Sequence, residues 1–305
     1  MIRITKLIAA GLCMLFPLLS FAEETLSSHI LKHDGNERTY LRFVPATEQH
    51  PGKPLPLVIL LHGGGGSGRS MMRYTRFNRL AREAGFIVIY PSGLNRRWND
   101  GRESHQAFDD VGFILKAIRQ TIAEANRVNE KRIFVAGMSN GGLMSQRLAC
   151  EQAELFSGIA IVTAQLTPEL ITSCHPSKPL AVLYINGTED RLVPYDGGAL
   201  APQWGPFGTV TPTAETLAFW RRVNRCEKTP AVTLLPDLDA NDGTRVEQYD
   251  WFGCATNAPL RLYRIVGGGH TWPGKRQYLP QTVIGLTSRD VDANKLIGEF
   301  FLSIH

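Results

Sequence analysis

The chain has 305 residues, 43% of them hydrophobic, and a formal net charge of +5 at pH 7. This length is enough for one large domain with a substantial core. The small positive excess is not clustered, which argues against nucleic-acid binding, and outside the N-terminus no segment is apolar enough to span a membrane.

Residues 1–22 have the three parts of a signal peptide. Two cations, Arg3 and Lys6, precede an apolar stretch that ends at Leu19, and a small-x-small cleavage site follows. The apolar stretch is too short for a comfortable membrane span. We therefore expect a secreted or periplasmic protein in which residues 23–305 form a single domain with no membrane association.

Apolar runs alternate with helix-like segments along the rest of the chain. The predicted strands are Arg38–Val44, Leu57–Leu61, Phe86–Tyr90, Arg132–Ala136, Ser157–Thr163, Leu180–Ile185 and Leu260–Val266. The predicted helices are Ser70–Ala84, Phe108–Asn126, Gly142–Ala153, Thr213–Arg222 and Asp290–Ser303. Most of the later strands are continuous Val, Ile, Leu and Phe runs, as in strands buried on both faces. The pattern predicts an α/β fold with a mainly parallel central sheet and helices on both faces.

The mature chain keeps an even number of cysteines, because the fifth, Cys13, belongs to the signal peptide. The four that remain are Cys150, Cys174, Cys226 and Cys254. In an exported protein this predicts two disulfides, with three possible pairings. We favour Cys150–Cys174 and Cys226–Cys254, since each pair closes a short local loop. The sequence has no C-x-x-C or H-E-x-x-H motif, so no metal site is predicted.

The segment Gly137-Met138-Ser139-Asn140-Gly141 lies between a predicted strand and a predicted helix. A strand, G-x-S-x-G and a helix in this order form the nucleophile elbow of serine hydrolases. The turn is so tight that the serine occupies a strained backbone conformation, and the flanking glycines remove Cβ atoms that would clash. The motif predicts Ser139 as a catalytic nucleophile.

A serine nucleophile needs a base, and the base needs an acid. His270 follows the last predicted strand within a glycine-rich stretch, and Asp190 follows the strand that ends at Ile185. The chain order of serine, acid and histidine is that of a hydrolase triad. Glu189 and Asp196 remain alternatives for the acid.

The oxyanion of an acyl-transfer reaction needs two backbone N–H donors. Asn140, directly after the nucleophile, is expected to supply one. The second is expected from the glycine run after an early strand, with Gly64 favoured and Gly63 and Gly65 as alternatives. We expect His62 to orient this loop rather than to transfer protons.

The same glycine run also fits G-x-G-x-x-G, at Gly63, Gly65 and Gly68, which would indicate dinucleotide binding. That reading requires an acidic residue at the end of the next strand. The strand instead ends Tyr90-Pro91-Ser92. We therefore expect no cofactor.

Several motifs together resemble the exported polyhydroxybutyrate depolymerase and feruloyl esterase family, which is related to carbohydrate esterases acting on xylan. They are His62-Gly63-Gly64-Gly65, Trp98-Asn99, Asp109-Asp110-Val111-Gly112-Phe113, Gly137–Gly142, Asn186–Asp190 and Gly267–Gly274. The resemblance implies an α/β-hydrolase fold, the triad Ser139, Asp190 and His270, and hydrolysis of carboxylic esters through an acyl-enzyme. Feruloyl, acetyl and hydroxyalkanoate esters stay open as substrates. A non-catalytic binding protein and a serine peptidase of the same fold are the alternatives.

Two features could shape the substrate pocket. The segment 193–213 is rich in glycine, proline and aromatic residues, and a loop of this length is uncommon unless it is functional. Trp98 and Trp272 are candidates to line the pocket by stacking on an acyl or alcohol group.

Overall fold

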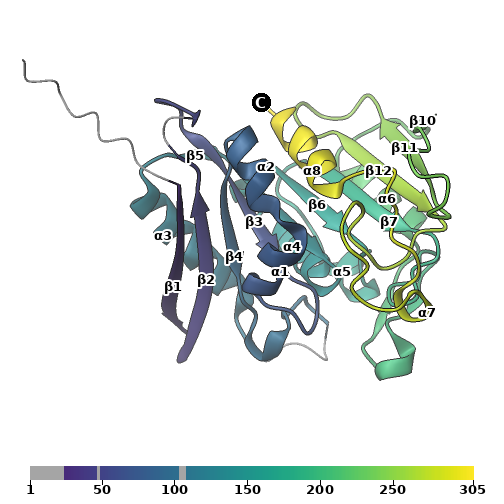
Figure 1. Ribbon diagram of the computed structural model, residues 1–305, viewed down its shortest axis with the longest axis horizontal. Coiled ribbons are helices and arrows are strands. Elements are labelled where there is room, and N and C mark those ends of the chain that lie inside the picture. The colour runs from purple at the N-terminus through teal and green to yellow at the C-terminus, as the bar shows by residue number, and fades with distance from the viewer. Residues whose placement is uncertain (1–23, 47–48, 103–107) are drawn as a thin grey trace, which may run out of the picture.

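The computed structural model describes residues 24–46, 49–102 and 108–305. Within these residues, ten strands form one sheet in the order β1-β2-β4-β3-β5-β6-β7-β12-β11-β10, and β8 and β9 form a small hairpin (Figure 1). The strands are β1 (Thr25–His33), β2 (Asn36–Val44), β3 (Leu55–Leu61), β4 (Ile87–Pro91), β5 (Val128–Met138), β6 (Gly158–Val162), β7 (Ala181–Gly187), β8 (Gly198–Ala199), β9 (Thr209–Val210), β10 (Ala231–Leu234), β11 (Arg245–Trp251) and β12 (Leu260–Val266).

The centre of the sheet is parallel from β4 through β3, β5, β6 and β7 to β12. Antiparallel strands extend it at both ends, β2 and β1 at one and β11 and β10 at the other. In a parallel sheet, the loops after the strands meet at one edge, where ligands bind. The loops after β3, β5, β7 and β12 carry Gly64, Ser139, Asp190 and His270.

The sheet separates two hydrophobic layers, and β3 shows how the sequence builds them. Leu57, Ile59 and Leu61 face one layer, while Val58 and Leu60 face the other. All five are fully buried, which explains why the strand is apolar throughout rather than alternating. The prediction of an α/β fold with a mainly parallel sheet is confirmed.

Helices cover both faces of the sheet. They are α1 (Gly68–Thr75), α2 (Phe77–Ala84), α3 (Asp110–Ala125), α4 (Asn140–Glu151), α5 (Pro168–Ser173), α6 (Thr213–Val223), α7 (Gln281–Ile284) and α8 (Ala293–Leu302). Residues of α1, α2 and α8 pack in the layer that contains Val58, and residues of α3, α4, α5 and α6 pack in the other. In Figure 1, α1, α2 and α8 lie in front of the sheet.

The predicted helix Ser70–Ala84 is two helices, and the prediction of one continuous helix is wrong. Arg76 has a left-handed backbone (φ 52°) that ends α1 and starts α2. The break frees the carbonyl of Thr75, which accepts a hydrogen bond from the Asn294 side chain at 2.7 Å. Because Asn294 lies on α8, this tertiary contact could not be read from the local sequence.

Strand β1 was not predicted, although its turn has a sequence signal. Asp34 and Gly35 connect β1 to β2, and both have positive φ (48° and 70°). An Asp-Gly pair is a preferred two-residue hairpin turn because it tolerates these angles. The edge strand therefore follows from a turn motif rather than from an apolar run.

Two disulfides join segments that lie outside the catalytic loops. Cys150 at the end of α4 pairs with Cys174 after α5, and Cys226 after α6 pairs with Cys254 after β11. These are the pairs favoured from loop length.

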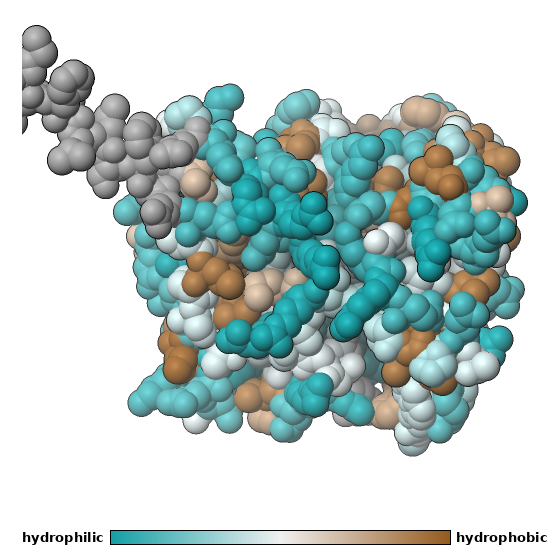
Figure 2. All heavy atoms as spheres, in the orientation of Figure 1, coloured by the Kyte–Doolittle hydropathy of each residue, from teal (hydrophilic) through white to brown (hydrophobic). Residues whose placement is uncertain are grey.

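On the face shown in Figure 2, hydrophobic side chains form small separate groups among hydrophilic ones. No helix in the described part of the chain is long and apolar enough to cross a membrane. The signal peptide predicted for residues 1–22 lies outside the described residues.

Candidate active site

Ser139 occupies the turn between β5 and α4, with φ 56° and ψ −124°. This conformation is rare for a residue with a side chain, and it persists only where the surroundings enforce it. Gly141 shows how tight the surroundings are, since an added Cβ would lie 2.5 Å from the carbonyl oxygens of Leu61 and His62. The predicted elbow is therefore present, and the two-residue glycine spacing has a steric cause.

His270 and Asp190 form a buried pair. His270 Nδ1 lies 2.8 Å from Asp190 Oδ2, and the histidine and aspartate are 2% and 7% exposed. Asp190 Oδ1 accepts the backbone N–H groups of Leu192 and Val193, both at 2.8 Å. The carboxylate is thus fixed on one side by its own loop, and its other oxygen orients the imidazole.

The two rivals for the acid are placed differently. Glu189 and Asp196 are both exposed, whereas Asp190 alone of the three pairs with His270. A carboxylate that holds an imidazole tautomer must contact a ring nitrogen directly. The geometry therefore favours Asp190 as the acid that orients His270.

Ser139 and His270 line the same cavity, which has a volume of about 800 Å³. The described residues include no direct hydrogen bond between the two side chains. In enzymes without bound substrate, catalytic hydrogen bonds are often long and tighten only in the substrate complex. Because Nδ1 of His270 is engaged by Asp190, Nε2 is the nitrogen left for Ser139.

The glycine run after β3 also lines this cavity, and its hydrogen bonds narrow the choice of oxyanion donor. Gly65 donates its N–H to Arg96 O at 2.8 Å, and Gly66 donates to Gly63 O at 3.0 Å. These two N–H groups are occupied, which removes Gly65 and leaves Gly63 and Gly64 as candidates. An added Cβ at Gly64 would lie 4.0 Å from the Cβ of Asn140, so the two predicted donors are neighbours.

His62 holds the glycine run in place. Its Nδ1 donates to Gly63 O at 2.8 Å, and its Nε2 accepts the N–H of Gly93 at 3.0 Å. This assigns the proton to Nδ1 of a neutral ring. Burial lowers the pKa of His62 to about 4, which suits a side chain that stays neutral near pH 7 and orients a loop.

Trp98 and Trp272 are not part of the cavity wall, contrary to the sequence prediction. Both side chains are fully buried, and neither is among the described residues that line the cavity. Trp98 Nε1 donates to His62 O at 2.8 Å, and Trp272 Nε1 donates to Asn294 Oδ1 at 2.9 Å. Each indole satisfies its N–H in the core, so both residues support the loops from behind.

Four other aromatic residues line the cavity. Tyr74 lies on α1, and Trp204, Phe207 and Tyr278 lie in segments that connect the regular elements. Trp204 is 53% exposed, and it belongs to the segment 193–213 that was expected to wall the site. Three arginines also line the cavity, Arg97, Arg102 and Arg276. The composition of the segment 193–213 gave a signal for Trp204 and Phe207. No motif marked Tyr74, Tyr278 or the three arginines, because their shared position depends on how the chain packs.

No three His, Cys, Asp or Glu side chains among the described residues gather closely enough to hold a metal ion. The chemistry available to the cavity from the chain is that of a hydroxyl, an imidazole, a buried carboxylate and backbone N–H groups.

Residues 44–206, more than half of the chain, match the family described as Phospholipase/Carboxylesterase. "Putative esterase NocK" of Nocardia uniformis subsp. tsuyamanensis is 32% identical over 92% of this chain and 84% of its own length. "Probable feruloyl esterase C" of Aspergillus niger is 31% identical over 78% of each chain. "Feruloyl esterase B" of Piromyces equi is 29% identical over 72% of this chain, which spans 40% of that longer relative.

Among solved structures, the acetyl xylan esterase from Aspergillus awamori aligns with a TM-score of 0.57 over 80% of this chain and 94% of that one. At 17% identity this shows a shared fold. The family itself is shown by the match over residues 44–206 and by the esterase relative that is 32% identical. The chain belongs to the phospholipase/carboxylesterase family and is a carboxylic ester hydrolase with the α/β-hydrolase fold.

Proposed function

We propose that the chain hydrolyses esters through an acyl-enzyme on Ser139. The observation that carries this proposal is the buried Asp190–His270 pair, 2.8 Å apart, at the same cavity as a serine on a strained elbow. Ser139 Oγ attacks the ester carbonyl carbon, and its proton passes to His270 Nε2. Asp190 holds the imidazole tautomer and stabilises the imidazolium.

The tetrahedral oxyanion accepts hydrogen bonds from the N–H group of Asn140, at the positively polarised start of α4, and from that of Gly64 in the loop after β3. When the intermediate collapses, the carbonyl carbon–alkoxy oxygen bond breaks and His270 gives its proton to the leaving alcohol. A water molecule then attacks the acyl-enzyme, with its proton again passing to His270, and the acid leaves as Ser139 is restored.

For the substrate, we propose an ester with an aromatic acyl group of the feruloyl type. The cavity of about 800 Å³ has room for a drug-sized ligand. Trp204 and Phe207 supply aromatic faces at its wall, and aromatic rings pair favourably with one another. Relatives at 29–31% identity are named feruloyl esterases, which supports the same substrate class.

The test is a comparison of kcat/KM on methyl ferulate, acetylated xylan, a hydroxybutyrate trimer and 4-nitrophenyl acetate. We expect the highest value on methyl ferulate. Ser139→Ala should lose at least about 10³-fold on every true substrate. Turnover retained by this variant would contradict the nucleophile assignment, and a fluorophosphonate probe that fails to label Ser139 would favour a non-catalytic binding protein.

We also propose that the protein is exported. Two disulfides suit an oxidising compartment, and the sequence begins with the features of a signal peptide. When cells of its host are fractionated, the native, unreduced protein should be found in the periplasm or medium, and an alkylating reagent should modify none of its four cysteines. Free thiols at these positions would argue against export.

A further inference from the structure

The side chain of Asn140 clamps a distant segment to the nucleophile elbow. Its Oδ1 accepts the N–H of Trp98 at 2.8 Å, and its Nδ2 donates to Trp98 O at 3.1 Å and to Asp100 Oδ2 at 2.6 Å. The residue is 7% exposed. The amide therefore has its hydrogen-bonding groups engaged, and the residue whose backbone N–H faces the oxyanion is fixed by its own side chain.

The Asp100 carboxylate places a full negative charge next to the Asn140 amide, and the Arg102 guanidinium neutralises that charge. Asp100 is 0% exposed and Arg102 5%. Arg102 Nε lies 2.9 Å from Asp100 Oδ1, and Arg102 Nη2 lies 2.6 Å from Asp100 Oδ2. A guanidinium that meets a carboxylate in this two-pronged way is a strong and directional pair.

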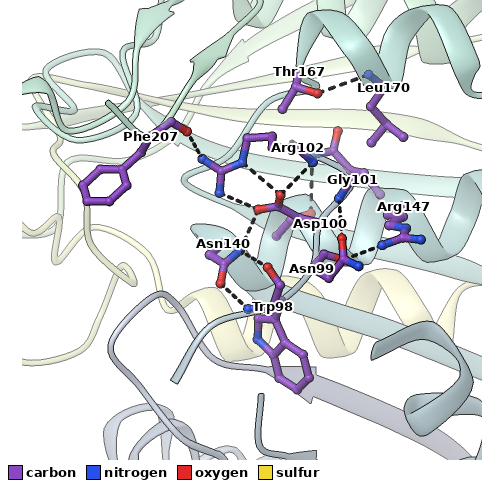
Figure 3. Close-up of polar contacts among 12 residues, drawn as sticks. Trp98, Asn99, Asp100, Gly101, Arg102, Asn140, Arg147, Thr167, Leu170 and Phe207 are labelled. Atoms are coloured by element: carbon purple, nitrogen blue, oxygen red, sulfur yellow. Dashed lines mark hydrogen bonds and ion pairs between the residues drawn. The ribbon is translucent and has the colours of Figure 1, made fainter. Parts of the chain in front are cut away.

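Arg102 also reaches the wall of the cavity. Its Nη1 donates to the backbone carbonyl of Phe207, and both residues line the cavity. Figure 3 shows the guanidinium between the Asp100 carboxylate and this carbonyl, with Asn140 on the other side of the carboxylate. The Phe207 ring is contacted in turn by Arg97, whose guanidinium carbon is 4.8 Å from the ring centroid.

We propose that Asp100 and Arg102 are positioning residues that join the oxyanion donor Asn140 to the substrate wall at Phe207. This inference rests on the proposed function, because it takes Asn140 as an oxyanion donor. Asp100 holds the nucleophile elbow in position by accepting a hydrogen bond from the Asn140 amide. Arg102 holds the aromatic wall in position by donating a hydrogen bond to the Phe207 carbonyl.

The pair also has an electrostatic task. A buried carboxylate next to Asn140, left uncompensated, would oppose the negative charge that develops on the substrate oxygen. The Arg102 guanidinium neutralises this charge, so that the pair presents no net negative charge next to Asn140. Losing Arg102 should therefore slow the chemical step, in addition to loosening the wall.

Three variants separate these effects. Arg102→Gln leaves the Asp100 charge unpaired, and we expect kcat to fall about 10- to 100-fold, as for a displaced catalytic group. Asp100→Asn with Arg102→Gln removes both charges, and kcat should recover much of that loss. Arg102→Lys keeps the cation but not the fork, so it should preserve kcat on 4-nitrophenyl acetate better than Arg102→Gln does.

The position of Phe207 can be followed through the preference for an aromatic acyl group. We measure this preference as the ratio of kcat/KM on methyl ferulate to kcat/KM on 4-nitrophenyl acetate. All three variants lose the guanidinium contact to the Phe207 carbonyl, so we expect this ratio to fall in each, mainly through KM on methyl ferulate.

A matched control is Arg38→Gln, which cuts another buried Arg–Asp pair, Arg38 with Asp110, whose side chains are each 1% exposed. Neither of these residues lines the cavity. We expect a loss of stability, measured by urea unfolding, with kcat per folded molecule and the aromatic-to-acetyl ratio unchanged.

If Arg102→Gln lowers only stability, as Arg38→Gln does, the positioning role is wrong. The same holds if the double variant is as slow as Arg102→Gln and the ratio is unchanged in all three. These failures leave the proposed function intact so long as Ser139→Ala is inactive. Activity in Ser139→Ala would instead contradict the proposed function itself.

Discussion

His270 Nδ1 lies 2.8 Å from Asp190 Oδ2, although 80 residues separate the two along the chain. The neighbouring parallel strands β7 and β12 end side by side and deliver the two loops to one place. The loops are tied together by the N–H of Glu189, which donates to Gly268 O at 2.8 Å. The backbone of these two loops thus holds the acid and the base within reach of each other.

The first prediction concerns Asp190 and its exposed neighbour. Asp190→Asn keeps the shape of the side chain but favours the wrong tautomer of His270, so kcat should fall about 10⁴-fold with little change in KM. Steady-state kinetics on 4-nitrophenyl acetate measure both parameters. Glu189→Gln is the control, because Glu189 is exposed, and it should keep the parent kcat. Equal losses in the two variants would mean that Asp190 is not the specific partner of His270.

The second prediction concerns the elbow glycines. In Gly141→Ala the new Cβ would lie 2.5 Å from two backbone carbonyl oxygens, so the turn must shift. We expect a loss of about 3 kcal/mol or more in the free energy of unfolding, as for other strained substitutions. In Gly64→Ala the Cβ would make an ordinary contact at 4.0 Å, and its stability should stay within about 1 kcal/mol of the parent. Urea unfolding of both variants checks the contrast, and a Gly141→Ala protein of full stability would contradict it.

The third prediction is a pH dependence of stability that comes from His62. Burial lowers its pKa from 6.5 to about 4. Between these values the unfolded chain binds a proton that the folded protein does not, so stability is lost as the pH falls from about 6.5 to 4. The contribution is about 3 kcal/mol.

His62→Gln removes this titration. The free energy of unfolding of the parent, measured in urea at pH 7.5, 5.5 and 4.5, should fall more steeply than that of His62→Gln. The variant starts from a lower value because it loses the contacts with Gly63 and Gly93. Parallel pH profiles for the two proteins would show that His62 does not contribute.

The sequence predicted the parts of the site that lie on strand ends. Ser139, Asp190 and His270 each follow a buried strand, and parallel strands must bring their carboxyl ends to one edge. Strands buried on both faces leave a strong apolar signal, which is why the centre of the sheet was predictable. The outer strands were missed because β11 is more polar, and β10 has only four residues, all exposed.

The parts that depend on loop packing were not predictable. Asp100 and Arg102 are two residues apart in an irregular loop, and their partners Asn140 and Phe207 are remote in sequence. The prediction that Trp98 and Trp272 line the pocket was wrong for a related reason. An indole can pack in a pocket wall or in the core equally well, and its surroundings depend on the tertiary fold.

The fourth prediction tests that correction by a crossed pair of substitutions. Trp98→Phe keeps a ring in the core but leaves the His62 carbonyl without its indole donor. The free energy of unfolding should fall by about 1–3 kcal/mol, while KM on methyl ferulate stays within about twofold of the parent, because the Trp98 ring does not line the cavity.

Trp204→Ala should instead raise KM and leave stability almost unchanged. Its side chain is 53% exposed at the cavity wall, so removing it should leave stability within about 0.5 kcal/mol of the parent. An aromatic pair contributes about 0.5–1.5 kcal/mol, so losing it should raise KM on methyl ferulate by about 3- to 10-fold. KM on 4-nitrophenyl acetate should rise less, because an acetyl group offers no ring to stack. A larger KM effect from Trp98→Phe than from Trp204→Ala would reinstate the original assignment of Trp98 to the pocket.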